Sequence, residues 1–193
     1  MGLKARLDAA RRGSIIPRMM LAPIPTLNGV VIGIPNGRAG VIRTLQAMRD
    51  LVNRSKVDPQ LRQAATSIIF LQPEKDYLAE AEAIFNFVRD SIRYTRDVHN
   101  VETLQTPQIT LATRQGDCDD QATLLAAMLE SVGIPTRFVV GGYNSTDFEH
   151  VYLQAWCGGW IGMDATEHQP MGWEPPQPLV IGYEDADGGI AAS

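Results

Sequence analysis

The chain has 193 residues, of which 45% are hydrophobic and 20% charged, and its formal net charge is −5 at pH 7. This composition predicts one soluble globular domain with extensions, since a domain of about 150 residues can bury about 70% of its unfolded surface. The mild negative charge argues against a nucleic-acid partner, and no run approaches the ~18 apolar residues of a membrane span, so we expect contact with neither nucleic acid nor membrane.

Residues 1–40 are expected to form an extended N-terminal arm. Regular helix is excluded over much of it by Pro17, Pro23, Pro25 and Pro35. The same prolines interrupt any signal-peptide core, so we expect no cleaved leader. Residues 13–40 are too apolar for a disordered linker, and we expect them to pack either on their own domain or on a second copy or protein partner.

The two ends of the chain differ in charge. Residues 1–18 hold five Lys and Arg against one Asp, and residues 164–193 hold six acids with no Lys or Arg. Such ends are typical of solvated tails, but they could also meet neighbouring subunits or a partner.

Three packing helices are predicted in the first half of the chain. The first covers residues 41–53, where apolar side chains recur at helical spacing. The second starts at Asp58 and Pro59, which suit the N-cap and first position of a helix. The third runs from Asp76 to about Tyr94. Residues 95–114 are expected to be a polar connection.

A helix followed by strands is predicted for the second half. The helix begins at Cys118 and ends near Ser131, before Gly133. Three β-rich stretches follow, at residues 136–142, 151–156 and 160–163. The last two are joined by Cys157-Gly158-Gly159, a tight hairpin signal.

Helices first and antiparallel strands after predict an α+β fold, with N-terminal helices packed on an antiparallel sheet. We place the main domain at residues 41–170 and an irregular acidic tail at residues 171–193. Trp156 and Trp160, at strand spacing, are expected in the core.

Cys118 is the candidate nucleophile. It follows a Gly-Asp turn and opens a helix, where free backbone N–H groups and the helix dipole favour a thiolate. The chain has two cysteines in all, too few for a disulfide framework, so we expect a reducing, cytoplasmic compartment. The second, Cys157, is expected to be an ordinary turn residue.

His150 and Asp164 are the candidate partners of Cys118. A thiol with a pKa near ~8.5 is mostly protonated at neutral pH, so it needs a base, and His150 can supply one. A third group must hold the imidazole in one tautomer, and Asp164 follows the strand expected to pair with the His150 strand. Together they make a thiol version of the Ser-His-Asp arrangement.

An oxyanion hole would use the backbone N–H of Cys118 and one polar side chain from upstream. The candidates for that side chain are Gln105, Gln108 and Gln115, and the sequence does not choose among them.

Asp117, Asp119 and Asp120 surround the thiol with negative charge, which raises its pKa. Asp119 and Asp120 could instead stabilise the helix start, where negative charge is favourable. A metal site built on Cys118, His150, Asp164 and Asp120 is the weaker alternative, because these residues include no closely spaced ligand pair. We expect neither a metal nor a cofactor.

The motif residues together resemble the transglutaminase-like superfamily of papain-type folds, over roughly residues 76–166. The resemblance rests on Gly116-Asp117-Cys118-Asp119-Asp120-Gln121-Ala122, the helix exit Gly133-Ile134-Pro135-Thr136-Arg137, His150 on a strand, and Asp164-Ala165-Thr166. Gln121 departs from the family pattern, which commonly has an aromatic residue there, and this change could alter a substrate groove.

The resemblance implies a papain-like core with Cys118 as nucleophile, His150 as base and Asp164 as the residue that orients the base. It also implies acyl transfer on amide bonds of a protein or peptide substrate, without a cofactor, and in bacterial members more often hydrolysis than cross-linking. Similar domains occur in tailed-phage and prophage proteins. The alternative is therefore a structural or assembly protein of a virion that retains the fold and uses residues 13–40 to bind partners or copies of itself.

Overall fold

The computed structural model describes residues 38–96, 103–142, 149–176, 180–184 and 190–192. The expected arm lies outside these residues, except for residues 38–40, which belong to a helix. The helices are α2 (Arg38–Ser55), α3 (Pro59–Ile69), α4 (Tyr77–Ser91), α5 (Pro107–Thr113) and α6 (Cys118–Ser131). The strands are β1 (Arg93–Tyr94), β2 (Gln115–Gly116), β3 (Thr136–Gly142), β4 (His150–Trp156), β5 (Trp160–Met163), β6 (Val180–Glu184) and β7 (Ile190–Ala192).

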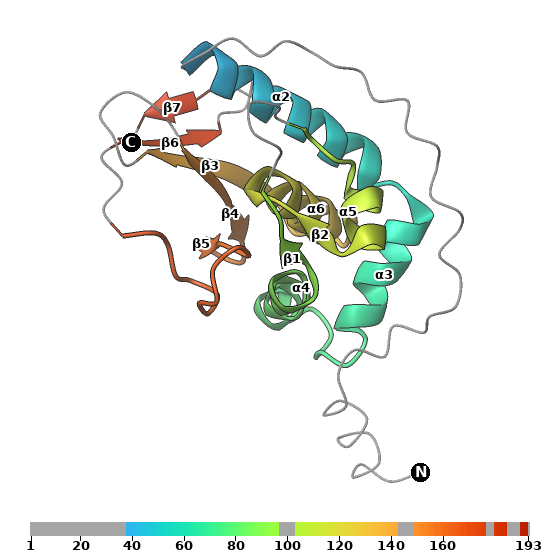
Figure 1. Cartoon of the computed structure of the whole chain (residues 1–193). Coiled ribbons are helices and arrows are strands. Elements are labelled where there is room, and N and C mark those ends of the chain that lie inside the picture. The colour runs from blue at the N-terminus through green and yellow to red at the C-terminus, as the bar shows by residue number, and fades with distance from the viewer. Residues whose placement is uncertain (1–37, 97–102, 143–148, 177–179, 185–189, 193) are drawn as a thin grey trace, which may run out of the picture.

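Five of these strands form one antiparallel sheet in the order β5-β4-β3-β6-β7. The described helices lie on one side of it, as Figure 1 shows. A second sheet is very small and pairs β1 with β2 in parallel. Helices that precede and cover an antiparallel sheet confirm the predicted α+β fold.

The central element is α6. Every residue from Asp120 to Leu129 is buried. The helix contacts β3 and β4 of the sheet and also α2, α3, α4 and α5. A helix is buried on all sides only when other elements surround it. The helix α6 is therefore the central element, packed between the sheet and the other helices.

The two faces of the sheet differ along β4. Val151, Leu153 and Ala155 belong to the hydrophobic core shared with α6. Successive side chains of a strand point to opposite faces, so His150 and Tyr152 lie on the face turned away from α6. His150, the candidate base, is thus the first residue of a strand whose opposite face packs against α6, the helix that begins with Cys118.

The helix starts expected from capping residues are confirmed. Asp58 accepts hydrogen bonds from the N–H groups of Gln60 and Leu61, at 2.8 and 3.0 Å, and a proline follows it at the first helical position. Asp76 caps α4 through the N–H of Ala79. This helix ends before the expected position, because Arg93 and Tyr94 pair with β2 as a strand.

Two expectations of irregular structure are wrong. The stretch taken as a polar connection contains α5, which starts with Pro107 after Thr106 and buries Ile109. The stretch taken as an irregular tail contains β6 and β7, which extend the sheet beyond β3. Short elements such as these depend on the neighbour they pair with, which a local pattern does not reveal.

The expectation that Trp156 and Trp160 are core residues is also wrong. They are 46% and 39% exposed. They sit opposite each other where β4 meets β5, with ring centroids 5.4 Å apart in an edge-to-face arrangement. Both project from the face of the sheet opposite to α6, where Trp160 lies 4.3 Å from the guanidinium of Arg137.

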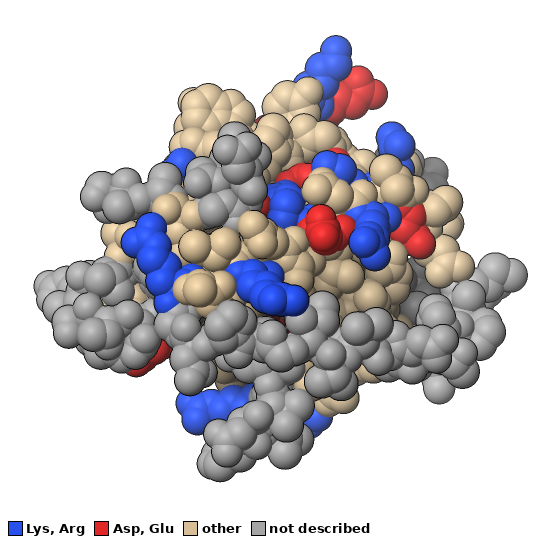
Figure 2. Space-filling model, turned by 90° about the horizontal axis from the view of Figure 1, so that it is seen from above, with Lys and Arg blue, Asp and Glu red and all other residues tan. Residues whose placement is uncertain are grey.

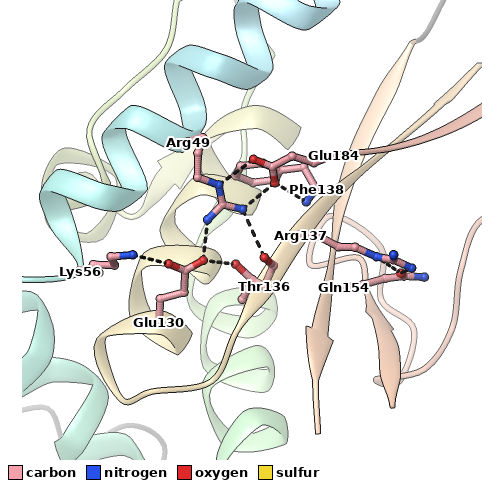
Figure 3. Close-up of polar contacts among 8 residues, drawn as sticks. All are labelled: Arg49, Lys56, Glu130, Thr136, Arg137, Phe138, Gln154 and Glu184. Atoms are coloured by element: carbon pink, nitrogen blue, oxygen red, sulfur yellow. Dashed lines mark hydrogen bonds and ion pairs between the residues drawn. The ribbon is translucent and has the colours of Figure 1, made fainter. Parts of the chain in front are cut away.

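An ion-pair cluster ties the first described helix to the end of the sheet (Figure 3). Arg49 of α2 binds both carboxylate oxygens of Glu184 on β6, at 2.7 and 2.6 Å, and contacts Glu130 at the end of α6. Glu130 also accepts from Lys56 at 3.0 Å and from Thr136 at 2.6 Å. The guanidinium therefore neutralises two carboxylates from different parts of the chain.

Charge on the molecular surface is mixed where it can be seen. On the face drawn in Figure 2, Lys and Arg side chains lie among Asp, Glu and uncharged residues. None of the helices within the described ranges has the length and apolar character required to cross a membrane.

We predict that Arg49→Met lowers the free energy of unfolding by about 3 kcal/mol, since removal of one partner leaves buried charges without compensation. The side chains of Glu130 and Glu184 are only 11% and 5% exposed. Urea unfolding followed by circular dichroism measures the effect. The matched control is Arg43→Met, an exposed position on the same helix, with an expected change below about 0.5 kcal/mol. Equal stability of the two variants would contradict the prediction.

Candidate active site

The turn that leads into α6 holds Cys118 in a fixed position. Asp117 is the N-cap, and its carboxylate accepts the N–H of Asp120 at 3.1 Å. Gly116 packs directly under the first helical turn, where a Cβ would approach the Cβ of Asp120 to 2.6 Å. Only glycine fits this contact without a shift of backbone, which explains the Gly-Asp-Cys order in physical terms.

The backbone carbonyl of Gly116 fastens the turn to its surroundings. It accepts the N–H of Thr95, next to β1, at 3.0 Å and the side-chain amide of Gln121 at 3.2 Å. Gln121 is 1% exposed, and its Oε1 has no partner among the described residues. It therefore supports the nucleophile turn from inside, and the sequence expectation that it shapes a substrate groove is not supported by its burial.

His150 and Asp164 are brought together as the sequence predicts. His150 Nε2 lies 2.7 Å from Asp164 Oδ2. The other oxygen of Asp164 accepts from the backbone N–H and the hydroxyl of Thr166, at 3.1 and 2.7 Å. Asp164 is 2% exposed, and burial by itself would raise its pKa. The hydrogen bonds from His150 and Thr166 outweigh burial and hold the pKa below its ordinary value.

The proton positions in this pair follow from that shift. An ionised carboxylate only accepts hydrogen bonds, so Nε2 of His150 carries a hydrogen and donates it to Asp164. In the neutral ring the opposite nitrogen, Nδ1, is then an acceptor, which a general base requires.

Cys118, the first residue of α6, approaches β4 from the side of the sheet that α6 covers. Its sulfur accepts the backbone N–H of Val151, the residue that follows His150. The thiol also lies 3.6 Å from Oδ1 of Asp119. The sulfur thus lies beside the start of β4, and the direct contact among the three sequence-predicted residues is the one between His150 and Asp164.

Burial and the charges around Cys118 disfavour its thiolate form. Burial, then the negative charges of Asp119 and Asp117, raise the pKa of the Cys118 thiol far above its ordinary value. The N–H of Val151 acts in the opposite direction but is the smaller effect. A raised pKa favours the protonated thiol, so a nucleophilic role for Cys118 requires a base that takes its proton.

The structure places the three candidate oxyanion donors differently. Gln105 donates its backbone N–H and its side-chain amide to Asp120, each at 2.7 Å. Gln108 accepts from the hydroxyl of Ser55 at 3.2 Å. Gln115 accepts from the guanidinium of Arg93 at 2.9 Å. Of the three, Gln105 is the one bonded to the first turn of the nucleophile helix.

Sequence reasoning assigned no role to two residues of the site, Tyr94 and Thr166. Tyr94 pairs with Gly116 across the small parallel sheet. Its pKa is raised by burial and by electrostatic interaction with Cys118 and Asp117, while a hydrogen bond from Arg96 opposes the rise. Thr166 supports Asp164 through two hydrogen bonds. The sequence signal for Thr166 was its place two residues after Asp164, and Tyr94 has no comparable local signal.

Metal ligation is not evident in the part of the chain that the structure describes, where no three His, Cys, Asp or Glu side chains are grouped to hold an ion. Asp120, the acid of the alternative metal site that lies on α6, is bonded to Gln105 through both carboxylate oxygens.

A family model and several solved structures match the chain. The model of the transglutaminase-like superfamily matches residues 63–165. A candidate cysteine protease from Cytophaga hutchinsonii is 26% identical, with a TM-score of 0.46 over 56% of this chain and 37% of that one. A candidate protease from Parabacteroides distasonis is 15% identical, with a TM-score of 0.56 over 82% of this chain and 31% of that one. Calcium-bound LapG of Legionella pneumophila is 18% identical, with a TM-score of 0.52 over 77% of this chain and 87% of that one.

These matches differ in how much of each protein they cover and in what they show. The chain spans about a third of the length of the Cytophaga and Parabacteroides proteins, 37% and 31%. The likeness to the Parabacteroides protein and to LapG, at 15% and 18% identity, shows a shared fold. The match of the family model covers α4, α5, α6 and β3–β5 and includes Cys118, His150 and Asp164.

We predict that Asp119→Asn speeds the alkylation of Cys118 by iodoacetamide near neutral pH by about three- to tenfold, because the loss of a neighbouring negative charge lowers the thiol pKa. The measurement uses the Cys157→Ser background, so that Cys118 is the only thiol. Asp50→Asn, an exposed acid on α2, serves as control and leaves the rate unchanged. An equal or slower rate for Asp119→Asn would show that this carboxylate does not govern the thiol.

A second prediction concerns Asp120, whose pKa is raised to about 7 by burial and the nearby charge of Asp117. The ordinary value is ~3.9, so between about pH 4 and pH 7 the native state keeps a proton that the unfolded state has lost, and stability falls as pH rises. Asp120→Asn cannot titrate. Its free energy of unfolding, relative to wild type, should therefore increase as pH rises through this window and level off above it. Urea unfolding at a series of pH values measures the difference, and parallel pH curves would contradict the raised pKa.

Proposed function

Because the chain belongs to the transglutaminase-like superfamily, we propose that it is a cysteine hydrolase or acyltransferase that acts on peptide or isopeptide bonds through Cys118, His150 and Asp164. The observation that carries the proposal is the 2.7 Å contact between His150 Nε2 and Asp164 Oδ2, with the Cys118 sulfur bonded to the adjoining Val151 N–H. Acyl transfer through a thioester requires a nucleophile, a general base and a residue that orients the base. Cys118, His150 and Asp164 are the residue types that fill these three roles.

The first step is attack on the amide carbonyl carbon. As the Cys118 sulfur forms its bond to this carbon, the thiol proton passes to Nδ1 of His150, and the carbonyl π electrons move to oxygen. The imidazolium that results is stabilised by the ionised Asp164 at its other nitrogen. Because the resting thiol has a raised pKa, proton transfer accompanies attack instead of preceding it.

The second step releases the amine. The carbon–nitrogen bond breaks, His150 returns the proton to the leaving nitrogen, and a thioester remains on Cys118. Water then attacks the thioester for hydrolysis, or an amine attacks it for transfer, with His150 again taking a proton. The thiol is regenerated at the end of either route.

The tetrahedral oxyanion requires donors. We assign these to the backbone N–H of Cys118 and the side-chain amide of Gln105, which is the upstream glutamine bonded to the first turn of α6. A short-lived oxyanion at the start of a helix also benefits from the helix dipole.

The alternative, an assembly protein of a virion, depends on residues 13–40. These lie outside the described residues apart from residues 38–40. It stays a prediction, as do the protein or peptide substrate and the compartment.

We predict a burst of p-nitrophenol when the chain is mixed with p-nitrophenyl acetate, because Cys118 is acylated before the thioester is hydrolysed. The size of the burst should equal the amount of protein, and mass spectrometry should find one acetyl group on the peptide that contains Cys118. Cys157→Ser is the matched control and keeps the burst, whereas Cys118→Ser loses it. A burst that survives in Cys118→Ser would exclude this residue as the nucleophile.

We also predict that Asp164→Asn slows acylation on the order of 10³-fold, since the amide no longer fixes the tautomer of His150 or stabilises the imidazolium. Thr166→Val, which removes one hydrogen bond to Asp164, should have a smaller effect in the same direction. Asp90→Asn changes an exposed acid elsewhere on α4 and serves as control. Stopped-flow release of p-nitrophenol gives the three rates, and a rate for Asp164→Asn near wild type would remove it from the mechanism.

A further inference from the structure

Asp120 has a pair of contacts that neither the cap of α6 nor the triad requires. It lies in the first turn of α6 and is 1% exposed. Its Oδ1 accepts the backbone N–H of Gln105 at 2.7 Å, and its Oδ2 accepts the side-chain Nε2 of the same residue at 2.7 Å. Both carboxylate oxygens are therefore committed to one residue from the segment ahead of α5.

A buried carboxylate at this position is costly. It is close to the negative charge of Asp117, and burial raises its pKa. Capping does not call for it, because Asp117 is already the N-cap of α6. A neutral residue would suit the helix start at a lower desolvation cost. The carboxylate is therefore explained by its hydrogen bonds to Gln105.

Asp120 fixes the orientation of the side-chain amide of Gln105. The amide of glutamine has a donor end and an acceptor end of nearly equal shape, and either can face a neighbour that both donates and accepts. The ionised form of Asp120, which prevails above about pH 7, only accepts hydrogen bonds, so it selects the NH₂ end of Gln105. The same nitrogen carries a second N–H, which the bond to Asp120 leaves available for another acceptor.

We propose that Asp120 is a positioning residue that fixes the Gln105 amide as the side-chain donor of the oxyanion hole. The inference rests on the proposed function, since it needs an oxyanion to form on the Cys118 adduct. Asp120 does not act on the thiol itself, whose pKa is raised by Asp119 and Asp117. Loss of Asp120 should therefore affect the step that builds negative charge on oxygen and spare the nucleophilicity of sulfur.

Two reactions of the same thiol separate these effects. Alkylation by iodoacetamide requires the sulfur but forms no oxyanion, whereas acylation by p-nitrophenyl acetate forms one. Both rates are measured in the Cys157→Ser background for the otherwise unchanged chain and for Asp120→Asn, Gln105→Ala and the double variant. Asp120→Asn keeps the size of the side chain and one acceptor oxygen, and Gln105→Ala leaves Asp120 in place.

The expected result is a split between the two reactions. Acylation falls on the order of 10²-fold in each single variant, the typical effect of losing one oxyanion donor, while alkylation changes less than about twofold. The double variant is no slower in acylation than Gln105→Ala, because the two residues act as one unit.

Other outcomes overturn the inference. Equal losses in both reactions would mean that Asp120 only supports the turn against Gly116, and unchanged acylation would mean that it has no role in the reaction. Additive losses in the double variant would separate Asp120 from Gln105. In each of these cases the unchanged chain still acylates, so the proposed function stands. Failure of the unchanged chain to acylate would instead refute the proposed function and the inference with it.

Discussion

The amino end of α6 depends on partners from outside the helix. A helix start leaves several N–H groups without partners in the helix, so they need acceptors from the turn before it. Asp117 takes one of them, Gly116 allows close packing, and Gln121 and Thr95 fasten the carbonyl of the turn. The position of the Cys118 sulfur beside β4 follows from this arrangement.

The same arrangement creates an electrostatic conflict. Carboxylates are favourable at a helix start, where they complement its positive end, but they disfavour a thiolate at the same place. In the proposed reaction, proton transfer during attack removes this conflict. Asp164, held by Thr166, is bonded to Nε2 of His150, which leaves Nδ1 as the proposed acceptor of the thiol proton. The acidic turn would then keep the thiol protonated at rest without preventing the proposed acyl transfer.

Much of the fold and the contact between His150 and Asp164 could be predicted from sequence, because the deciding signals are local. The cap at Asp58, the periodicity of the helices and the Gly-Asp-Cys turn each involve residues close together in the chain. Contacts between distant residues could not be predicted, such as Gln105 with Asp120 or Arg49 with Glu184. Trp156 and Trp160 show the limit for strands, since alternation predicts two faces but does not tell which one is covered.

The central claim is that Cys118 forms a tetrahedral adduct whose oxygen is held at the start of α6. A crystal structure of the chain reacted with a peptide aldehyde tests it most directly, because the hemithioacetal has the geometry of the intermediate. The account predicts a covalent bond from Cys118 to the aldehyde carbon, with its oxygen about 3 Å from the backbone N–H of Cys118 and from Nε2 of Gln105. An adduct on Cys157, or an oxygen directed away from α6, would contradict it.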